Sequence, residues 1–253
     1  DNFSSNSHLM DYANIRYAVE AGRENLGTVF VFSAGNSRAD GENVNYHNFQ
    51  NARETLTVAA VDSSDVVESF STPGAAIITS AYGSNVLTTD RLGADGYNEG
   101  GKDYTLFSGT SAAAPEVSAI VALMLEANAN LGYRDVQEIV AHASRHPGSA
   151  DWKINTSTDH NLGGMYFNDD MGFGIIDAHA AVRLAETWQT QHTAHNEAYV
   201  GVRELGTNDV IPDGIDGSSL KSTFTINTNI DVEHVELSVD IRHGRMGDLE
   251  IDL

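Results

Sequence analysis

Apolar and polar positions in the first half of the chain predict an α/β domain. Residues 9–25 carry apolar side chains at helical spacing, and residues 29–32 form a short continuous apolar run. Similar runs follow at Thr55–Val61 and Ala75–Ala81. Continuous runs of this length are typical of strands buried on both faces of a parallel sheet. We therefore expect a parallel sheet with helices packed against it.

Three further segments predict helices. Residues 110–127 are apolar all round, which indicates a helix buried in the core, and Pro115 lies near its start, where proline is tolerated. The pattern predicts two more helices, at residues 133–144 and 177–188. Asp177 is a suitable N-cap for the second of these helices.

The pattern changes after about residue 195. Thr223–Ile226, His234–Ile241 and Leu249–Leu253 alternate apolar and polar residues, which is typical of half-buried antiparallel strands. The polar stretch Gln189–Ala198 separates the two patterns. We therefore expect two domains, an α/β domain over residues 1–190 and the first part of an all-β domain over residues 191–253.

Composition limits the classes of function that fit the chain. The chain has 14 Lys and Arg against 36 Asp and Glu, a net charge of −22. Such a surface repels phosphate backbones and anionic lipids, so we expect no nucleic-acid partner. No apolar run approaches the ~20 residues that span a bilayer, so we expect no membrane span in this chain. The acidity suits a soluble exported protein, or one with carboxylate sites for calcium, and the absence of cysteine excludes disulfides and thiol catalysis.

The strongest chemical signal is the segment 108–115, SGTSAAAP, at the start of the predicted core helix. The hydroxyl of Ser111 would lie at the positive end of the helix dipole, and its backbone N–H would be one of the unpaired donors of the first turn. Such a donor can face a developing oxyanion. A plain N-cap before an alanine-rich helix is the alternative for Thr110 or Ser111.

A second signal follows the first apolar run. Ser33-Ala34-Gly35-Asn36 lies at the carboxyl end of a predicted strand, where α/β proteins place their sites. The Asn36 side-chain amide could donate to a substrate oxygen. An ordinary turn asparagine is the alternative.

Together these segments resemble the subtilisin-like serine peptidases, in particular the proprotein-convertase branch typified by kexin and furin. The resemblance extends over five co-linear segments: 32–36 (FSAGN), 108–115 (SGTSAAAP), 125–137 (LEANANLGYRDVQ), 171–188 (MGFGIIDAHAAVRLAETW) and 234–253 (HVELSVDIRHGRMGDLEIDL). It implies a three-layer subtilisin-like fold, followed by part of a jelly-roll P domain. It also implies an endopeptidase with Ser111 as nucleophile and Asn36 in the oxyanion hole.

The resemblance implies that the catalytic aspartate and histidine precede the serine along the chain. None of the ten histidines stands in the family's His-Gly-Thr setting. The chain also opens without a start methionine or signal peptide. We therefore expect both residues before residue 1 of a longer protein. We expect that protein to be secreted or extracellular, or associated with the cell surface, to be monomeric, and to act on proteins or peptides.

Four further residues are predicted to contact substrate: Ser33, Gly35, His47 and Thr110. His47 occupies the place of a convertase aspartate that binds a basic side chain at P1, the residue whose carbonyl is attacked. Preference for basic residues is therefore in doubt.

Calcium is a second implication of the resemblance that the sequence supports only in part. Thr72 replaces a glutamate that holds a calcium ion behind the P1 pocket, whereas Glu42 keeps an acidic residue at another ligand position. Asp40 and Glu42 are the candidate ligands, and a solvated acidic loop is the alternative for each.

Two other functions are consistent with parts of this pattern. A pseudo-protease or binding module would keep the fold without the chemistry. An esterase-type serine hydrolase would show a G-x-S-x-G elbow, and none surrounds Ser111.

Overall fold

The structure is a computed structural model that describes residues 9–98, 100–154, 165–201, 210–212, 219–230, 232–239 and 241. The chain divides into two compact units, residues 1–201 and 202–253.

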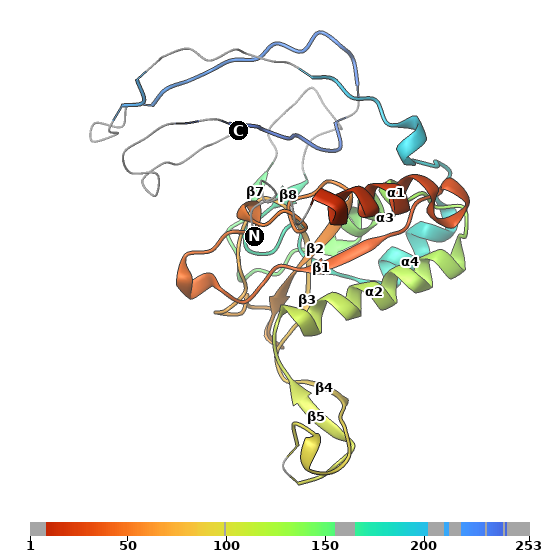
Figure 1. The fold of residues 1–253 in the computed structure, drawn as a ribbon, viewed down its shortest axis with the longest axis vertical. Coiled ribbons are helices and arrows are strands. Elements are labelled where there is room, and N and C mark those ends of the chain that lie inside the picture. Colours follow the sequence, from red (N-terminus) through yellow and green to blue (C-terminus); the bar gives the residue numbers. More distant parts are fainter. Residues whose placement is uncertain are drawn as a thin grey trace. The chain divides into compact units, whose positions relative to one another are not determined.

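The first unit contains the regular elements of the described residues (Figure 1). The α-helices are α1 (Leu9–Asn25), α2 (Thr110–Ala127), α3 (Tyr133–His142) and α4 (Ala178–Thr187). The strands are β1 (Phe30–Ser33), β2 (Thr55–Val61), β3 (Ile77–Tyr82), β4 (Val86–Thr89), β5 (Tyr104–Phe107), β6 (Ser144–Arg145), β7 (Lys153–Ile154), β8 (Tyr166–Phe167) and β9 (Ile175–Ile176). Short 3₁₀ helices are η1 (Arg38–Asp40), η2 (Val44–Tyr46), η3 (Gly93–Asp95) and η4 (Ala194–Asn196).

The predicted parallel sheet is confirmed. Five strands lie in the order β1-β2-β3-β9-β6, and every pair is parallel except β6 with β9. All residues of the central strand β2 are buried. The prediction that the first strand is buried on both faces is wrong, because β1 is an edge strand here and its residues are only part-buried.

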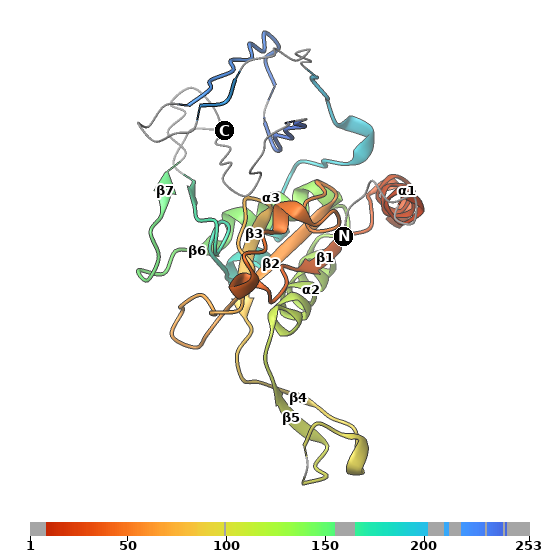
Figure 2. The same ribbon diagram turned by 60° about the vertical axis from the view of Figure 1, so that its left-hand side comes forward.

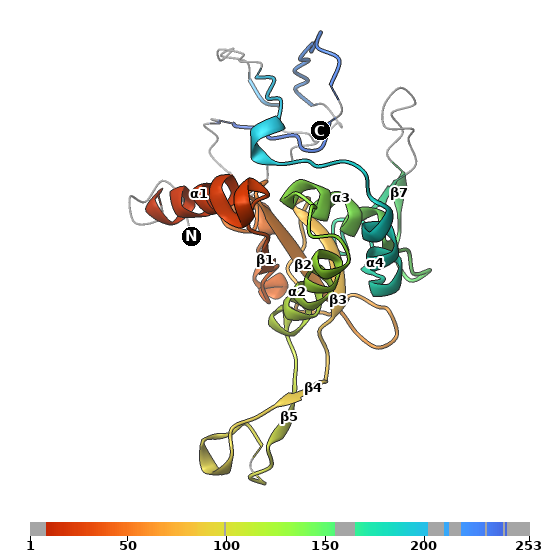
Figure 3. The same cartoon turned by 90° about the vertical axis from the view of Figure 1, so that its right-hand side faces the viewer.

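Alternate residues of β2 point to the two faces of the sheet. Leu56, Val58 and Ala60 pack against α2, α3 and α4 in one large apolar cluster. On the other face, Ala59 packs with Ala34 and Val44 from the loop after β1. Figure 3 shows α1 beside β1, at the end of the sheet away from α4. The loop that carries Asn36 and the helix that carries Ser111 thus converge on the ends of β1 and β2.

Helix α2 is not buried all round, contrary to the prediction. Val117, Val121 and Met124 face the sheet, whereas Ala119 and Leu123 are on an exposed side, Leu123 with half of its surface accessible. In the described residues no element covers that side. By length and composition alone α2 could cross a bilayer, but its packing on β1, β2 and β3 is that of a core helix.

An antiparallel hairpin, β4–β5, precedes α2 and projects away from the sheet (Figures 1 and 2). Val86 pairs with Phe107, and Leu87 pairs with Leu106. The two leucines are 67% and 62% exposed, respectively. The hairpin was not predicted, and it forms one wall of the cleft described below.

The second unit does not show the predicted strands. Thr223–Ile226 and the described residues of His234–Ile241 are not in strands, and residues 249–253 lie outside the described part. A segment with alternating apolar and polar residues forms a strand only where a neighbouring strand supplies the hydrogen bonds of the ladder. Val235, Leu237 and Val239 are exposed, so their apolar face has no partner layer in the described residues. The all-β domain stays a prediction.

A buried carboxylate joins α3 to the segment after α4. Asp135 is fully buried and accepts hydrogen bonds from the Gly132 N–H (2.7 Å) and from the Trp188 Nε1–H (2.8 Å). It also accepts from the Thr190 hydroxyl (3.1 Å) and the His192 N–H (2.9 Å). This carboxylate fixes the start of α3 and the exit of the chain from α4.

Asp135→Ala is expected to lower the free energy of unfolding by about 2–3 kcal/mol, because it leaves buried donors without an acceptor. Urea unfolding of the full-length protein measures the effect. Asp151→Ala, which removes an exposed carboxylate, is the matched control and should leave the midpoint unchanged. Equal midpoints for the two variants would contradict the role given to Asp135.

Candidate active site

The loop after β1 is tied directly to the first turn of α2. The Asn36 Oδ1 accepts from the Thr110 N–H (3.0 Å) and from the Thr110 hydroxyl (2.9 Å). The same hydroxyl accepts from the Gly35 N–H (3.1 Å). Because both bonds from Thr110 need an acceptor, the atom that faces it must be the amide oxygen. The Nδ2 donor of Asn36 is therefore turned away from Thr110.

Two glycines make this junction possible. Gly35 has φ +99° and Gly109 has φ +143°, conformations that residues with a Cβ rarely adopt. A Cβ on Gly109 would lie 3.4 Å from Asn36 Nδ2 and 3.7 Å from the backbone N of Ser111. Two nitrogen atoms that carry N–H donors thus lie within 4 Å of the position left open by the absent side chain. A carbonyl oxygen that develops negative charge could be held there.

Ser111 lies at the second position of α2 and is exposed. In the first turn of a helix the backbone N–H groups have no helical carbonyl to bond, so that of Ser111 is available to a ligand. In contrast, Thr110 is fully buried and locked in the network with Asn36. The sequence alone did not decide which of these two residues is only an N-cap. In the structure, Thr110 positions the loop, and the hydroxyl-bearing residue that is accessible is Ser111.

A cleft of about 490 Å³ opens beside Ser111. Its walls are the β4–β5 hairpin and one side of α2. The lining residues are Val86, Leu87, Thr88, Phe107, Ser111, Ala112, Pro115, Glu116 and Ala119. No histidine is among these lining residues.

Glu116 is the functional candidate that sequence reasoning missed. Its carboxylate accepts from the Tyr82 N–H (3.2 Å), and burial raises the pKa of Glu116 above its usual value. Its signal in the sequence was a charged residue near the start of a largely apolar helix.

The remaining predicted substrate contacts, apart from Thr110, lie at the end of β1 or in the segment that follows it. Ser33 ends β1, and its carbonyl accepts from the Gln50 side chain (3.3 Å). His47 Nε2 lies 3.0 Å from Glu42 Oε2, so the two residues pair with each other. Asp40 lies in η1. None of Ser33, Gly35, His47 and Thr110 lines the cleft beside Ser111.

The calcium site suggested for this loop stays a prediction. Glu42 is occupied by His47, and no group of three or more acidic or histidine side chains among the described residues could hold a metal ion. Thr72 takes a different part: its hydroxyl accepts from the Ser37 N–H (3.0 Å), and its N–H donates to the Gly35 carbonyl (3.0 Å). It therefore supports the Asn36 loop directly.

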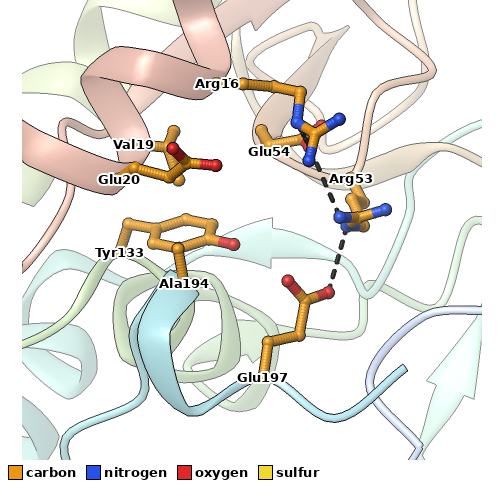
Figure 4. A pocket seen from close by; sticks show the side chains of 8 residues that line it. All are labelled: Arg16, Val19, Glu20, Arg53, Glu54, Tyr133, Ala194 and Glu197. Atoms are coloured by element: carbon orange, nitrogen blue, oxygen red, sulfur yellow. Dashed lines mark ion pairs between the residues drawn. The ribbon is translucent and has the colours of Figure 1, made fainter.

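A separate polar pocket of about 90 Å³ lies between α1, α3 and η4 (Figure 4). Its buried Glu54 accepts from the Tyr12 hydroxyl (3.1 Å), and burial raises the pKa of Tyr12 to about 12. Arg53 Nε lies 3.0 Å from Glu197 Oε1. This network holds α1 and the segment after α4 together and does not include Ser111.

The chain is similar to curated proteins of known family. Two curated relatives are proprotein convertase subtilisin/kexin type 6 from Rattus norvegicus and type 4 from Homo sapiens, at 30% and 31% identity. Each alignment covers 94% of this chain, but only 25% and 31% of the respective relative. The chain thus spans about a quarter to a third of the length of these relatives.

Solved structures share the fold. A serine protease of Aeromonas sobria superposes with a TM-score of 0.64 at 23% identity, over 75% of this chain and 41% of that one. A protease from Pseudoalteromonas arctica reaches 0.52 at 28% identity, over 67% and 46%. The model of the subtilase family matches residues 2–174, which is more than half of the sequence. The chain belongs to the subtilase family.

Proposed function

We propose that the full-length protein is a serine-type endopeptidase that hydrolyses peptide bonds in proteins through an acyl-enzyme on Ser111. One observation carries the proposal: Ser111 is accessible, and its backbone N and the Asn36 Nδ2 both lie within 4 Å of the position that a Cβ on Gly109 would take. Membership of the subtilase family supports it.

In this mechanism the Ser111 hydroxyl attacks the scissile carbonyl carbon and gives its proton to a base. The carbonyl oxygen becomes an oxyanion between Asn36 Nδ2 and the Ser111 N–H. The C–N bond then breaks, and the amine leaves with the proton from the base. Water attacks the acyl-enzyme in the same way and releases the acid. The lock between Thr110 and Asn36 keeps the side-chain donor oriented throughout.

We propose that the base is a histidine, oriented by an aspartate, from sequence before residue 1. The family places both ahead of the serine, and no histidine is among the described residues that line the cleft. The proposal assigns no catalytic role to calcium.

Hydrolysis of casein by the full-length protein tests the proposal. We expect activity that a serine-directed fluorophosphonate abolishes. A protein that binds casein but neither cleaves it nor reacts with the reagent would instead be a pseudo-protease. That alternative is favoured only by the lack of a histidine in the described cleft. The acidic composition supports a secreted or extracellular, monomeric protein.

Cleavage is expected not to require Arg or Lys at P1. A cationic side chain gains most from a desolvated carboxylate, and the structure places the His47–Glu42 pair in this loop instead. His47→Asp should raise the preference for basic over neutral P1 residues by about tenfold, because it adds a carboxylate beside Glu42 and frees Glu42 from its partner.

Profiling on a peptide library measures this preference. His179→Asp introduces the same charge at an exposed position on α4 and serves as the control. Strict cleavage after Lys or Arg by the unaltered protein would contradict the prediction.

A further inference from the structure

The proposed oxyanion donor, Asn36, lies on an exposed turn after β1. Its Oδ1 is held by the Thr110 N–H and hydroxyl, which fixes one end of the side chain. A catalytic donor has to stay within about 0.5 Å of its productive position, and a side chain is placed only as well as the backbone that carries it. The backbone on both sides of Asn36 therefore also has to be held.

Thr72 bonds to the backbone on both sides of Asn36. Its N–H donates to the Gly35 carbonyl (3.0 Å), and its hydroxyl accepts from the Ser37 N–H (3.0 Å). Gly35 leaves room for this approach, because a Cβ there would lie 3.1 Å from the Thr72 Oγ1. Thr72 is almost completely buried, so water competes little for these bonds. A single buried residue thus holds the turn at two points.

The segment that carries Thr72 is itself anchored to the core. The Ser71 hydroxyl accepts from the Ala60 N–H of β2 (3.1 Å), and every residue of β2 is buried. The Pro73 carbonyl accepts from the N–H of the buried Val44 (2.9 Å). Both neighbours of Thr72 are therefore fixed, and Thr72 connects the exposed turn to the central strand of the sheet.

We propose that Thr72 is a positioning residue for the reaction, which keeps the Asn36 Nδ2 in place for the oxyanion by holding the backbone of Gly35 and Ser37. This inference rests on the proposed function, because it takes Asn36 as an oxyanion donor. The role requires the Thr72 hydroxyl, since a methyl group in its place fills similar volume but accepts no hydrogen bond. Because Thr72 acts through Asn36, its effect should depend on the Asn36 side chain being present.

Steady-state hydrolysis of a peptide by the full-length protein tests the proposal. We expect Thr72→Val to lower kcat by about tenfold with KM unchanged, because a misplaced donor is felt mainly in the transition state. Thr72→Ser keeps a hydroxyl and should retain kcat to within about twofold. In an Asn36→Leu background, Thr72→Val should cost less than about twofold, since the donor that it positions is already absent.

Thr79→Val is the matched control. Thr79 is a fully buried threonine of β3 whose hydroxyl is bonded to the Ser144 Oγ (2.9 Å) and to the Gly174 carbonyl (3.0 Å). Its substitution removes a buried hydroxyl away from Asn36. Thr79→Val should therefore lower the unfolding midpoint, as Thr72→Val does, but leave kcat unchanged.

The inference would be overturned, with the peptidase assignment left standing, by any of three results: an unchanged kcat in Thr72→Val, an equal loss in Thr72→Ser, or a tenfold loss that persists beside Asn36→Leu. Absence of all cleavage by the unaltered protein would instead overturn the proposed function. In that case, hydrogen exchange at the Thr110 N–H, which donates to the Asn36 Oδ1, still decides whether Thr72 holds Asn36. Exchange that becomes about tenfold faster in Thr72→Val and not in Thr79→Val would support this role, and equal rates would overturn it.

Discussion

Ser111→Ala is expected to lower the turnover of the full-length protein by about 10⁶-fold, the loss known for the nucleophile of subtilisin, a relative. Alanine keeps the backbone N–H that faces the oxyanion but has no oxygen to form the acyl-enzyme. Ser111 is exposed and lies outside the Thr110–Asn36 network, so the substitution should leave the unfolding midpoint unchanged. Steady-state hydrolysis of a peptide substrate, together with thermal unfolding, measures both effects.

Ser118→Ala provides the control, since Ser118 is a second exposed serine of α2 whose hydroxyl only donates to the Ala114 carbonyl (3.1 Å). It should retain full turnover. An Ser111→Ala variant with turnover within a hundredfold of the unaltered protein would mean that another group supplies the nucleophile.

Asn36→Leu is expected to lower kcat by about 10²–10³-fold with little change in KM, a magnitude known for the corresponding donor of subtilisin. The Nδ2 group near the Gly109 space would stabilise the oxyanion, which exists in the transition state and not in the bound substrate. Its loss therefore affects the chemical step more than binding.

Leucine also removes the acceptor for Thr110, so a second variant separates the two roles of Asn36. Asn36→Asp keeps an oxygen toward Thr110 but replaces the donor with a negatively charged oxygen. We expect it to lose at least as much turnover as Asn36→Leu. If Asn36→Asp lost less than tenfold, Asn36 would be a turn residue that only holds the loop.

Sequence patterns predicted the elements whose signal is local and strong. The bounds of β2 and α2 agree with the predicted 55–61 and 110–127, and the Asp177 side chain caps α4 by accepting from the Ala180 N–H (2.9 Å). A continuous apolar run marks a buried strand wherever it lies in a sheet. It does not show which strand is at the edge, and this is why β1 is less buried than predicted.

Long-range arrangement limits the rest. The β4–β5 hairpin has only four residues in each strand, separated by a loop, so no periodic signal identified it. The alternating segments near residues 223–241 require partner strands that the described residues do not provide. Similarly, the exposed face of α2 could not be read from its composition, because burial depends on which elements pack against the helix.

Some residues of the candidate site could be predicted from the sequence, and others could not. Ser111 and Asn36 stand in short motifs that the sequence displays directly, and the structure brings their segments into contact through Thr110. The pairing of His47 with Glu42 and the cleft position of Glu116 depend on distances between side chains. The spacing of residues along the chain does not predict those distances.

The most direct test of the acyl-enzyme is covalent capture at Ser111. The full-length protein is incubated with a fluorophosphonate and digested, and the modified peptide is sequenced by mass spectrometry. The account predicts a single adduct on Ser111, formed at a rate that Asn36→Leu reduces and absent from Ser111→Ala. An adduct on a different residue, or labelling that persists in Ser111→Ala, would contradict it.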